Sequence, residues 1–279
     1  MSPRYAVFGQ PIAHSLSPRI HALFGTQLGI AIDYRAIEAG RGEFADRVEA
    51  FAHDSGRGAN VTLPLKEDAL ALCADLSERA RRAGSVNTLI RDGERWCGDS
   101  TDGIGLLRDL RERRACDPHD LRVLLLGAGG AARAAAFALA DAGVRELVIA
   151  NRTLKRAEAL ATAIGDAAHV GVRAWSTLAS ARPFDLIVNA TAAGHANAAL
   201  DVPRTLLDEQ TLCYDLSYGK AACAFLDGAR KSEATRLSDG LGMLVEQAAE
   251  SFFLWHGVRP DTAAVYAELR DSPTAPAAS

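Results

Sequence analysis

The chain has 279 residues and a formal net charge of −4, and 48% of its residues are hydrophobic and 24% charged. This composition is typical of a soluble globular protein with one or two domains. The weakly acidic balance favours neither nucleic acid nor an anionic membrane as a partner. No apolar run approaches the roughly 18 residues of a membrane helix, and we expect no secretory signal from the first residues.

The five cysteines are odd in number and form no Cys-x-x-Cys pair. This usage is typical of reduced, structural thiols, so we expect a cytoplasmic protein. The seven histidines lack the His-x-x-x-His spacing, which argues against a metal site. The motifs of serine hydrolases and of P-loop nucleotide hydrolases are also missing from the sequence.

The first hundred residues alternate between predicted strands and helices. Strands are expected at 5–8, 33–37, 58–63, 85–90 and 95–98, and helices from residue 17 and at 43–52, 65–74 and 102–113. Ser17 suits the N-cap of the first helix, and Pro18 suits its first turn. The alternation predicts a first α/β domain over residues 1–101.

An apolar run at residues 122–126 predicts a strand buried on both faces of a parallel sheet. A Gly-Ala-Gly-Gly turn at 127–130 follows, and then an alanine-rich helix. Gly127 permits the tight turn, and Gly129 lets a pyrophosphate approach the backbone, where the free N–H groups of the helix start favour negative charge. Ala132 allows close packing of helix and strand. This order of elements predicts a dinucleotide-binding domain.

The next predicted strand, 146–150, indicates which dinucleotide is bound. An NAD site usually carries an acidic residue after this strand, which binds the ribose 2′-hydroxyl. This chain has Arg152 there, with Lys155 and Arg156 close behind. Guanidinium groups bind phosphate in bidentate fashion, and a bound anion would explain cations at a helix N-terminus. The predicted cofactor is therefore NADP(H).

Further strands are expected at 170–174, 184–190 and 212–216, with helices between them. They complete a Rossmann-like, doubly wound parallel sheet in a domain over residues 102–238. Two last helices, at 241–256 and 261–270, belong to a C-terminal segment, 239–279, that we expect to pack back on the first domain. The predicted fold is thus two α/β domains.

Three segments of the first domain carry polar side chains that the hydrophobic pattern does not explain. They contain Ser15 and Ser17, then Asn60, Thr62 and Lys66, and then Asn87 and Asp102. Taken singly, each residue could be a cap or a solvated surface residue. Taken together, they suit a small polar polyol acid beside a nicotinamide. A Lys–Asp pair can hold and transfer charge where a carbonyl becomes an alcohol.

The chain resembles the shikimate dehydrogenase family. The resemblance is carried by SLSP (15–18), NVTLPLK (60–66), GSVNT (84–88), STDG (100–103), GAGGAAR (127–133), NRT (151–153), NAT (189–191), YDLSY (214–218) and DGLGMLVEQAA (239–249). These motifs cover nearly the whole chain in the family's order. The resemblance implies an NADPH-dependent, reversible reduction of 3-dehydroshikimate to shikimate, a step of chorismate and aromatic amino-acid biosynthesis.

The resemblance also implies a cleft between the two α/β domains, and it implies roles for single residues. Lys66 and Asp102 would form the catalytic pair. The substrate would be bound by Ser15, Ser17, Asn60, Thr62, Lys66, Asn87, Asp102, Tyr218 and Gln247. The cofactor would be bound by Gly127, Ala128, Gly129, Gly130, Ala131, Asn151, Arg152, Thr153 and Arg156, with Thr191, Leu216 and Gly240 on its nicotinamide side. No metal is implied.

Some positions depart from the family's pattern. Residues 192–195 read AAGH, where members often have small hydroxyl residues, and Leu216 and Lys220 stand where many have Met and Pro. Two alternatives stay open: a quinate/shikimate dehydrogenase with broader substrate or NAD use, and a non-catalytic NADPH-binding regulatory protein. The first should carry an acid near Arg152, and the second has no reason to keep Lys66 and Asp102. The expected partner is a small molecule, and the sequence leaves open whether the protein forms a homodimer.

Overall fold

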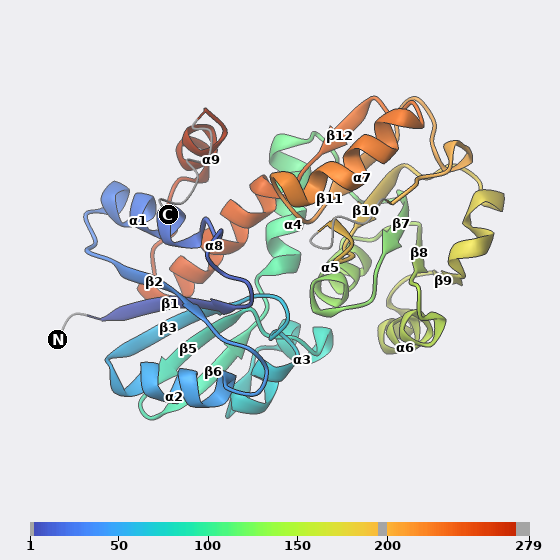
Figure 1. Cartoon of the computed structure of the whole chain (residues 1–279). Helices are drawn as coiled ribbons and strands as arrows, with labels where there is room; N and C mark the ends of the chain where they lie inside the picture. The colour runs from blue at the N-terminus through green and yellow to red at the C-terminus, as the bar shows by residue number, and fades with distance from the viewer. Residues whose placement is uncertain (1–2, 195–199, 272–279) are drawn as a thin grey trace. The chain divides into compact units, whose positions relative to one another are not determined.

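The computed structural model describes residues 3–194 and 200–271 (Figure 1). No helix within these ranges is long and apolar enough to cross a membrane. The chain forms two compact units. Unit 1 comprises residues 1–105 and 245–279, and unit 2 comprises residues 106–244. Both boundaries fall inside helices, a few residues after the domain boundaries predicted from the sequence.

Unit 1 contains a six-stranded mixed sheet with the strand order β2-β1-β3-β5-β6-β4. Its strands are β1 (Arg4–Gly9), β2 (Asp33–Glu38), β3 (Gly56–Val61), β4 (Asp75–Leu76), β5 (Thr88–Asp92) and β6 (Arg95–Asp99). Its helices are α1 (Ser17–Leu28), α2 (Phe44–His53), α3 (Glu78–Ala83) and α9 (Thr262–Asp271), and a 3-10 helix covers Asp68–Leu72. Helices α4 (Asp102–Arg113) and α8 (Leu241–His256) cross the unit boundaries.

Helices lie on both faces of this sheet (Figure 1). On one face Phe8 of β1 makes edge contacts with Phe44 and Phe51 of α2, at ring distances of 5.8 and 5.7 Å. On the other face Phe24 of α1 meets Phe252 of α8 at 5.8 Å. Helices α8 and α9 therefore return to unit 1, as the sequence predicted.

Unit 2 contains a six-stranded parallel sheet with the strand order β12-β11-β10-β7-β8-β9. Its strands are β7 (Arg122–Leu126), β8 (Glu146–Ala150), β9 (Val170–Arg173), β10 (Leu186–Asn189), β11 (Leu212–Asp215) and β12 (Arg236–Ser238). Helices α5 (Gly130–Asp141) and α6 (Leu154–Ile164) lie on the face opposite α7 (Lys220–Lys231) (Figure 1). The two-unit α/β fold with a Rossmann-like second sheet is thus confirmed.

Two local predictions about secondary structure are wrong. The predicted helix over 65–74 is a turn and the short 3-10 helix, because the backbone N–H groups of Ala74 and Ser77 bond to β6 and draw the chain into the sheet edge. Ser17 is not an N-cap either. Leu16 holds that position without a side-chain cap, and Ser17 is the first residue of α1, with an exposed fraction of 4%.

Candidate active site

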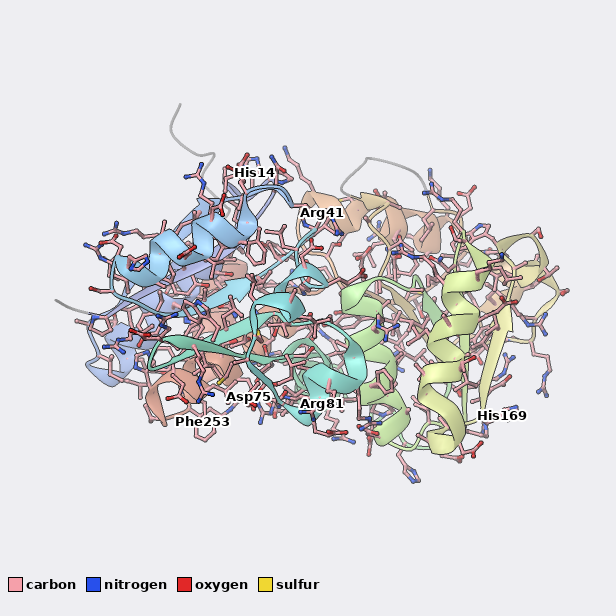
Figure 2. The ribbon with its side chains drawn as sticks, turned by 90° about the horizontal axis from the view of Figure 1, so that it is seen from below. His14, Arg41, Asp75, Arg81, His169 and Phe253 are labelled. Carbon is pink, nitrogen blue, oxygen red and sulfur yellow. The ribbon has the colours of Figure 1, made fainter. Side chains whose placement is uncertain are left out.

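The centre of the candidate site is an ion pair between Lys66 and Asp102. Lys66 lies in the turn after β3, and Asp102 is the first residue of α4. Arg41 holds this turn from outside, since its guanidinium donates to the Pro64 carbonyl (3.0 Å) and to Asp68 (2.7 Å) (Figure 2). The Lys66 side chain is 16% exposed and that of Asp102 is 5% exposed. The ammonium is therefore largely shielded from water yet still reachable by a small molecule.

Asn87, just before β5, fixes the orientation of Asp102. Its amide nitrogen donates to Asp102 Oδ1 (2.8 Å) and to Gln247 Oε1 of α8 (3.1 Å). Its amide oxygen accepts from the backbone N–H of Thr101 (2.7 Å). Lys66 occupies the other carboxylate oxygen of Asp102. Because both oxygens have partners, the carboxylate is held in one orientation beside the ammonium.

Further buried hydroxyls and amides connect Asn87 with Asn60 on β3. Thr88 Oγ1 donates to Asn87 Oδ1 (3.0 Å) and lies 2.8 Å from Ser251 Oγ. Asn60 Nδ2 donates to Ser251 Oγ (2.9 Å), and Asn60 Oδ1 accepts from the Tyr34 hydroxyl (2.8 Å). Both groups of the Asn60 amide thus contact protein atoms. A direct contact of Asn60 with substrate stays a prediction.

The predicted serine and threonine ligands lie around the start of α1 and the end of β3. Ser15 Oγ accepts from the backbone N–H of Ser17 (3.3 Å). The backbone N–H of Thr62 donates to the Phe8 carbonyl of β1 (2.8 Å). A Cβ on Gly9 would lie only 2.4 Å from the Thr62 methyl group. Glycine at this place therefore allows Thr62 to pack against β1.

A charged cluster anchors the end of β6, which leads into Asp102. The carboxylate of Asp99 accepts hydrogen bonds from Ser77 Oγ (2.6 Å) and from Arg79 (2.6 and 2.9 Å). Burial raises the pKa of Asp99, but these hydrogen bonds outweigh burial, so the pKa lies below its usual value. Arg79 also pairs with Glu250 of α8 at 3.2 Å. The cluster therefore ties α8 to the strand that positions Asp102.

In unit 2, the turn after β7 has the form that a dinucleotide requires. Gly127 has a φ of 115°, and a Cβ there would lie 2.8 Å from the Ala190 carbonyl oxygen. A Cβ on Gly129 would meet no described atom within 4 Å, so the space above this turn is open. Gly130 and Ala131 are the first two residues of α5, and a helix N-terminus favours negative charge. These residues fit a pyrophosphate.

The end of β8 carries the cations predicted to bind the 2′-phosphate. Arg152 and Arg156 are exposed, and neither side chain pairs with a carboxylate in the described part of the chain. Asn151 Nδ2 donates to the Thr153 carbonyl (2.9 Å) and so shapes the turn that carries Arg152. Two exposed guanidinium groups at this place suit a phosphate group.

Thr191 is held at the end of β10 by a buried polar chain. Its hydroxyl donates to Asn189 Oδ1 (2.8 Å), and Asn189 Nδ2 donates to Asp215 Oδ2 (2.8 Å). Burial raises the pKa of Asp215 to about 6, although hydrogen bonds from Ser217 and Asn189 oppose the effect. These contacts connect the ends of two neighbouring parallel strands, β10 and β11.

Gly240 precedes α8 and lies against Leu216. A Cβ on Gly240 would lie 2.2 Å from the Leu216 carbonyl oxygen, which excludes any other residue without a backbone shift.

Across residues 3–194 and 200–271, no group of three or more His, Cys, Asp or Glu side chains could hold a metal ion.

Three family models match the chain. The shikimate dehydrogenase substrate binding domain matches residues 7–89, the shikimate/quinate 5-dehydrogenase model matches 109–217, and the shikimate 5′-dehydrogenase C-terminal domain matches 240–270. A shikimate dehydrogenase (NADP(+)) of Stenotrophomonas maltophilia is 56% identical, over 97% of this chain and 96% of that protein. That of Xanthomonas campestris pv. campestris is 57% identical, over 96% and 95%.

The chain belongs to the shikimate dehydrogenase family. Solved structures are also similar to this chain in sequence and in fold. A Thermus thermophilus shikimate 5-dehydrogenase in complex with NADP(H) and shikimate is 37% identical, with a TM-score of 0.84, over 96% of this chain and 99% of that one. The 5-ketofructose reductase of a Gluconobacter species is 31% identical, with a TM-score of 0.82, over 97% and 99%.

Against this family background, unit 1 holds the predicted substrate residues except Tyr218, which follows β11 in unit 2. All the predicted cofactor residues lie in unit 2. Lys66, Asp102, Asn87 and Gln247 are joined by direct contacts. His195, in the segment that departs from the family's pattern, lies outside the described residues. His14 is exposed in the loop before α1 (Figure 2).

The sequence did not reveal every residue that supports the Lys66–Asp102 pair. Thr88 directly follows Asn87 and Thr101 directly precedes Asp102, so their places in the same polar motifs could have indicated their role. Tyr34 and Ser251 gave no such signal. Tyr34 lies in an ordinary strand pattern, and Ser251 lies on the apolar face of a long helix.

Proposed function

We propose that this protein is an NADP-dependent shikimate dehydrogenase that catalyses the reversible reduction of 3-dehydroshikimate to shikimate in aromatic amino-acid biosynthesis. The observation that carries the proposal is the Lys66–Asp102 pair, with Asn87 on the second carboxylate oxygen. Relatives more than 50% identical over nearly the whole chain bear the same enzyme name. In this proposal, unit 1 binds the substrate and unit 2 binds the cofactor.

Lys66 is the proposed proton donor to the oxygen of the substrate ketone. When bound, NADPH supplies the hydride that the carbonyl carbon accepts. The ammonium of Lys66 stabilises the negative charge that develops on the oxygen and then protonates it. In the reverse direction, the amine of Lys66 takes the proton from the alcohol.

Asp102 orients Lys66 and accepts a hydrogen bond from a substrate hydroxyl. It can do both only if its carboxylate stays fixed, and Asn87 and Thr101 provide that restraint. The remaining substrate contacts are assigned to hydroxyl and amide groups of the same unit, Ser15, Ser17, Thr62 and Gln247, and to Tyr218 of unit 2. Such groups suit the hydroxyls and carboxylate of a small polyol acid.

The cofactor preference is assigned to Arg152 and Arg156. Both are exposed at the end of β8, where an acidic residue would instead favour NAD. The open space above Gly129 would hold the pyrophosphate at the start of α5. Thr191 and Gly240 would line the nicotinamide side. The five cysteines are free thiols, which supports a cytoplasmic enzyme.

A substrate and cofactor panel tests this proposal against its rivals. Initial rates are measured for the purified protein with 3-dehydroshikimate, 5-ketofructose, shikimate and quinate, each with the NADP and the NAD forms of the cofactor. We expect fast turnover only with the 3-dehydroshikimate/shikimate pair and NADP(H). Quinate oxidation with NAD would favour the broader dehydrogenase. NADPH binding without any turnover would favour the regulatory protein.

A further inference from the structure

A row of hydrogen bonds in unit 2 runs from Ser217 through Asp215 and Asn189 to Thr191. The backbone N–H of Ser217 donates to Asp215 Oδ1 (2.7 Å), and Asn189 Nδ2 donates to Asp215 Oδ2 (2.8 Å). Asp215 and Asn189 are each 1% exposed. Both carboxylate oxygens therefore accept from protein donors, in a place that is almost completely shielded from water.

Asp215 determines which way the Asn189 amide points. Burial raises the pKa of Asp215 to about 6, so its carboxylate is largely ionised at neutral pH and only accepts hydrogen bonds. It therefore binds the NH2 group of Asn189, and the amide oxygen faces Thr191. That oxygen accepts from the backbone N–H of Thr191 (3.1 Å) and from its hydroxyl (2.8 Å).

This arrangement decides which kind of hydrogen bond Thr191 can offer to a ligand. Its hydroxyl has one proton, which it donates to Asn189, and two lone pairs. The backbone N–H of Ala193 lies 3.4 Å from the same oxygen and uses one of the lone pairs. The hydroxyl of Thr191 can thus meet a ligand only as an acceptor.

Thr191 lies where this fold binds its ligand. A Cβ on Gly127 would lie 3.3 Å from the backbone nitrogen of Thr191, so Thr191 adjoins the glycine turn. A Cβ on Gly240 would likewise lie 3.0 Å from the carbonyl oxygen of Asp215. Thr191 and Asp215 stand at the carboxyl ends of the parallel strands β10 and β11, and open α/β sheets bind their ligands at such ends.

We propose that Asp215 is a positioning residue for the cofactor, which acts through Asn189 and holds the Thr191 hydroxyl as an acceptor for a donor group on the nicotinamide half of NADPH. The inference rests on the proposed function, in which Thr191 lies on the nicotinamide side. The carboxamide NH2 and the ribose hydroxyls are the donors of that half. A neutral amide at position 215 could not replace the carboxylate, because its NH2 end would face a donor of either Ser217 or Asn189.

The test is the variant Asp215→Asn, which keeps the shape of the side chain and removes its charge. Dissociation constants are measured for NADPH and for adenosine 2′,5′-bisphosphate, which has the 2′-phosphate end of the cofactor but no nicotinamide. We expect the constant for NADPH to rise about three- to tenfold, the effect of one lost hydrogen bond. The constant for the bisphosphate should change by less than about twofold, because Arg152 is unaltered. The KM for 3-dehydroshikimate should also stay unchanged.

A double-mutant cycle with Thr191→Val identifies the route of the effect. Valine removes the hydroxyl at nearly constant volume, so Thr191→Val alone should also weaken NADPH binding. In that background, Asp215→Asn should raise the dissociation constant for NADPH by less than about twofold. The matched control is Asp227→Asn, which removes an exposed carboxylate of α7 and should leave both dissociation constants unchanged.

Three results would overturn the inference: an unchanged affinity for NADPH in Asp215→Asn, equal losses of affinity for NADPH and for the bisphosphate, or equal effects of Asp215→Asn in both backgrounds. Equal losses for the two ligands would show that Asp215 merely supports the folded unit. Turnover of the parent protein tests the proposed function separately. An inactive parent that binds NADPH contradicts the enzymatic function, whereas the titrations still decide the role of Asp215.

Discussion

Lys66 and Asp102 form an ion pair across 36 positions of the chain. A pair this shielded from water is maintained only where further hydrogen bonds satisfy the charged groups. Asn87 supplies such a bond to the Asp102 carboxylate. The ammonium, carboxylate and amide therefore behave as one unit, and changes to any of them should affect the same step of the reaction.

Replacement of Lys66 by alanine removes the proposed proton donor. We expect kcat for 3-dehydroshikimate to fall about 10²–10⁴-fold, the usual contribution of a general acid. The dissociation constant for NADPH should stay close to that of the parent, since the proposed cofactor residues lie in unit 2. Steady-state rates and a fluorescence titration with NADPH measure the two quantities. The control is Lys231→Ala, an exposed lysine at the end of α7. Near-normal turnover in Lys66→Ala would remove the residue from the mechanism.

Replacement of Asn87 by alanine leaves Asp102 with Lys66 but without the amide. A buried carboxylate that loses a hydrogen bond forfeits about 1–3 kcal/mol, so kcat/KM should fall by roughly 10- to 100-fold. Circular dichroism should show a folded protein. If kcat/KM changes by less than about twofold in a folded variant, the restraint of Asp102 by Asn87 is unimportant for catalysis.

Replacement of Arg152 by alanine tests the cofactor preference. Loss of a charge-assisted hydrogen bond to the 2′-phosphate should raise the KM for NADPH about 10- to 100-fold. The KM for NADH should change little, because that cofactor has no phosphate there. Arg230→Ala, which breaks an exposed ion pair with Asp227 on α7, is the matched control. Equal losses for both cofactors would contradict the assignment of Arg152.

His21 should make the protein less stable in acid. Its pKa is about 3 in the folded protein, mainly through burial, against a usual value of 6.5. The unfolded chain therefore binds more protons than the folded chain between these values. His21 therefore does not lower the free energy of unfolding above pH 6.5. It lowers this free energy progressively as the pH falls from 6.5 toward 3.

The variant His21→Phe keeps an aromatic ring but cannot titrate. The difference in unfolding free energy between parent and variant should change by up to about 1.4 kcal/mol per pH unit between pH 6.5 and 3, in the direction that penalises the parent at low pH. Asp215, with its raised pKa, acts in the opposite direction between about pH 4 and 6 and cancels in the difference. Parallel curves of unfolding free energy against pH would show that His21 does not couple to folding.

Much of the fold follows from patterns that are local in the sequence. The apolar run of β7, the Gly-Ala-Gly-Gly turn and the alanine-rich α5 specify one strand–turn–helix unit, and the structure has it at the predicted residues. The segment after β3 was mispredicted because its backbone bonds to β6, a contact that no local pattern reveals.

The candidate site likewise contains residues that the local sequence could indicate and residues that it could not. Lys66, Asn87 and Asp102 stand in polar motifs that interrupt the hydrophobic pattern, so the sequence could point to them. Tyr34 and Ser251 could not be found in this way, because their importance comes from meeting Asn60 in the folded chain.

The most direct test of the proposed reaction follows the hydride. The protein is incubated with 3-dehydroshikimate and NADPH that carries deuterium at the transferable position, and the product is examined by mass spectrometry and NMR. The proposed function predicts shikimate with one deuterium on the carbon that bore the ketone. It also predicts that Lys66→Ala forms this product about 10²–10⁴-fold more slowly. Unlabelled shikimate, or no shikimate at all from the parent protein, would contradict the proposed reaction.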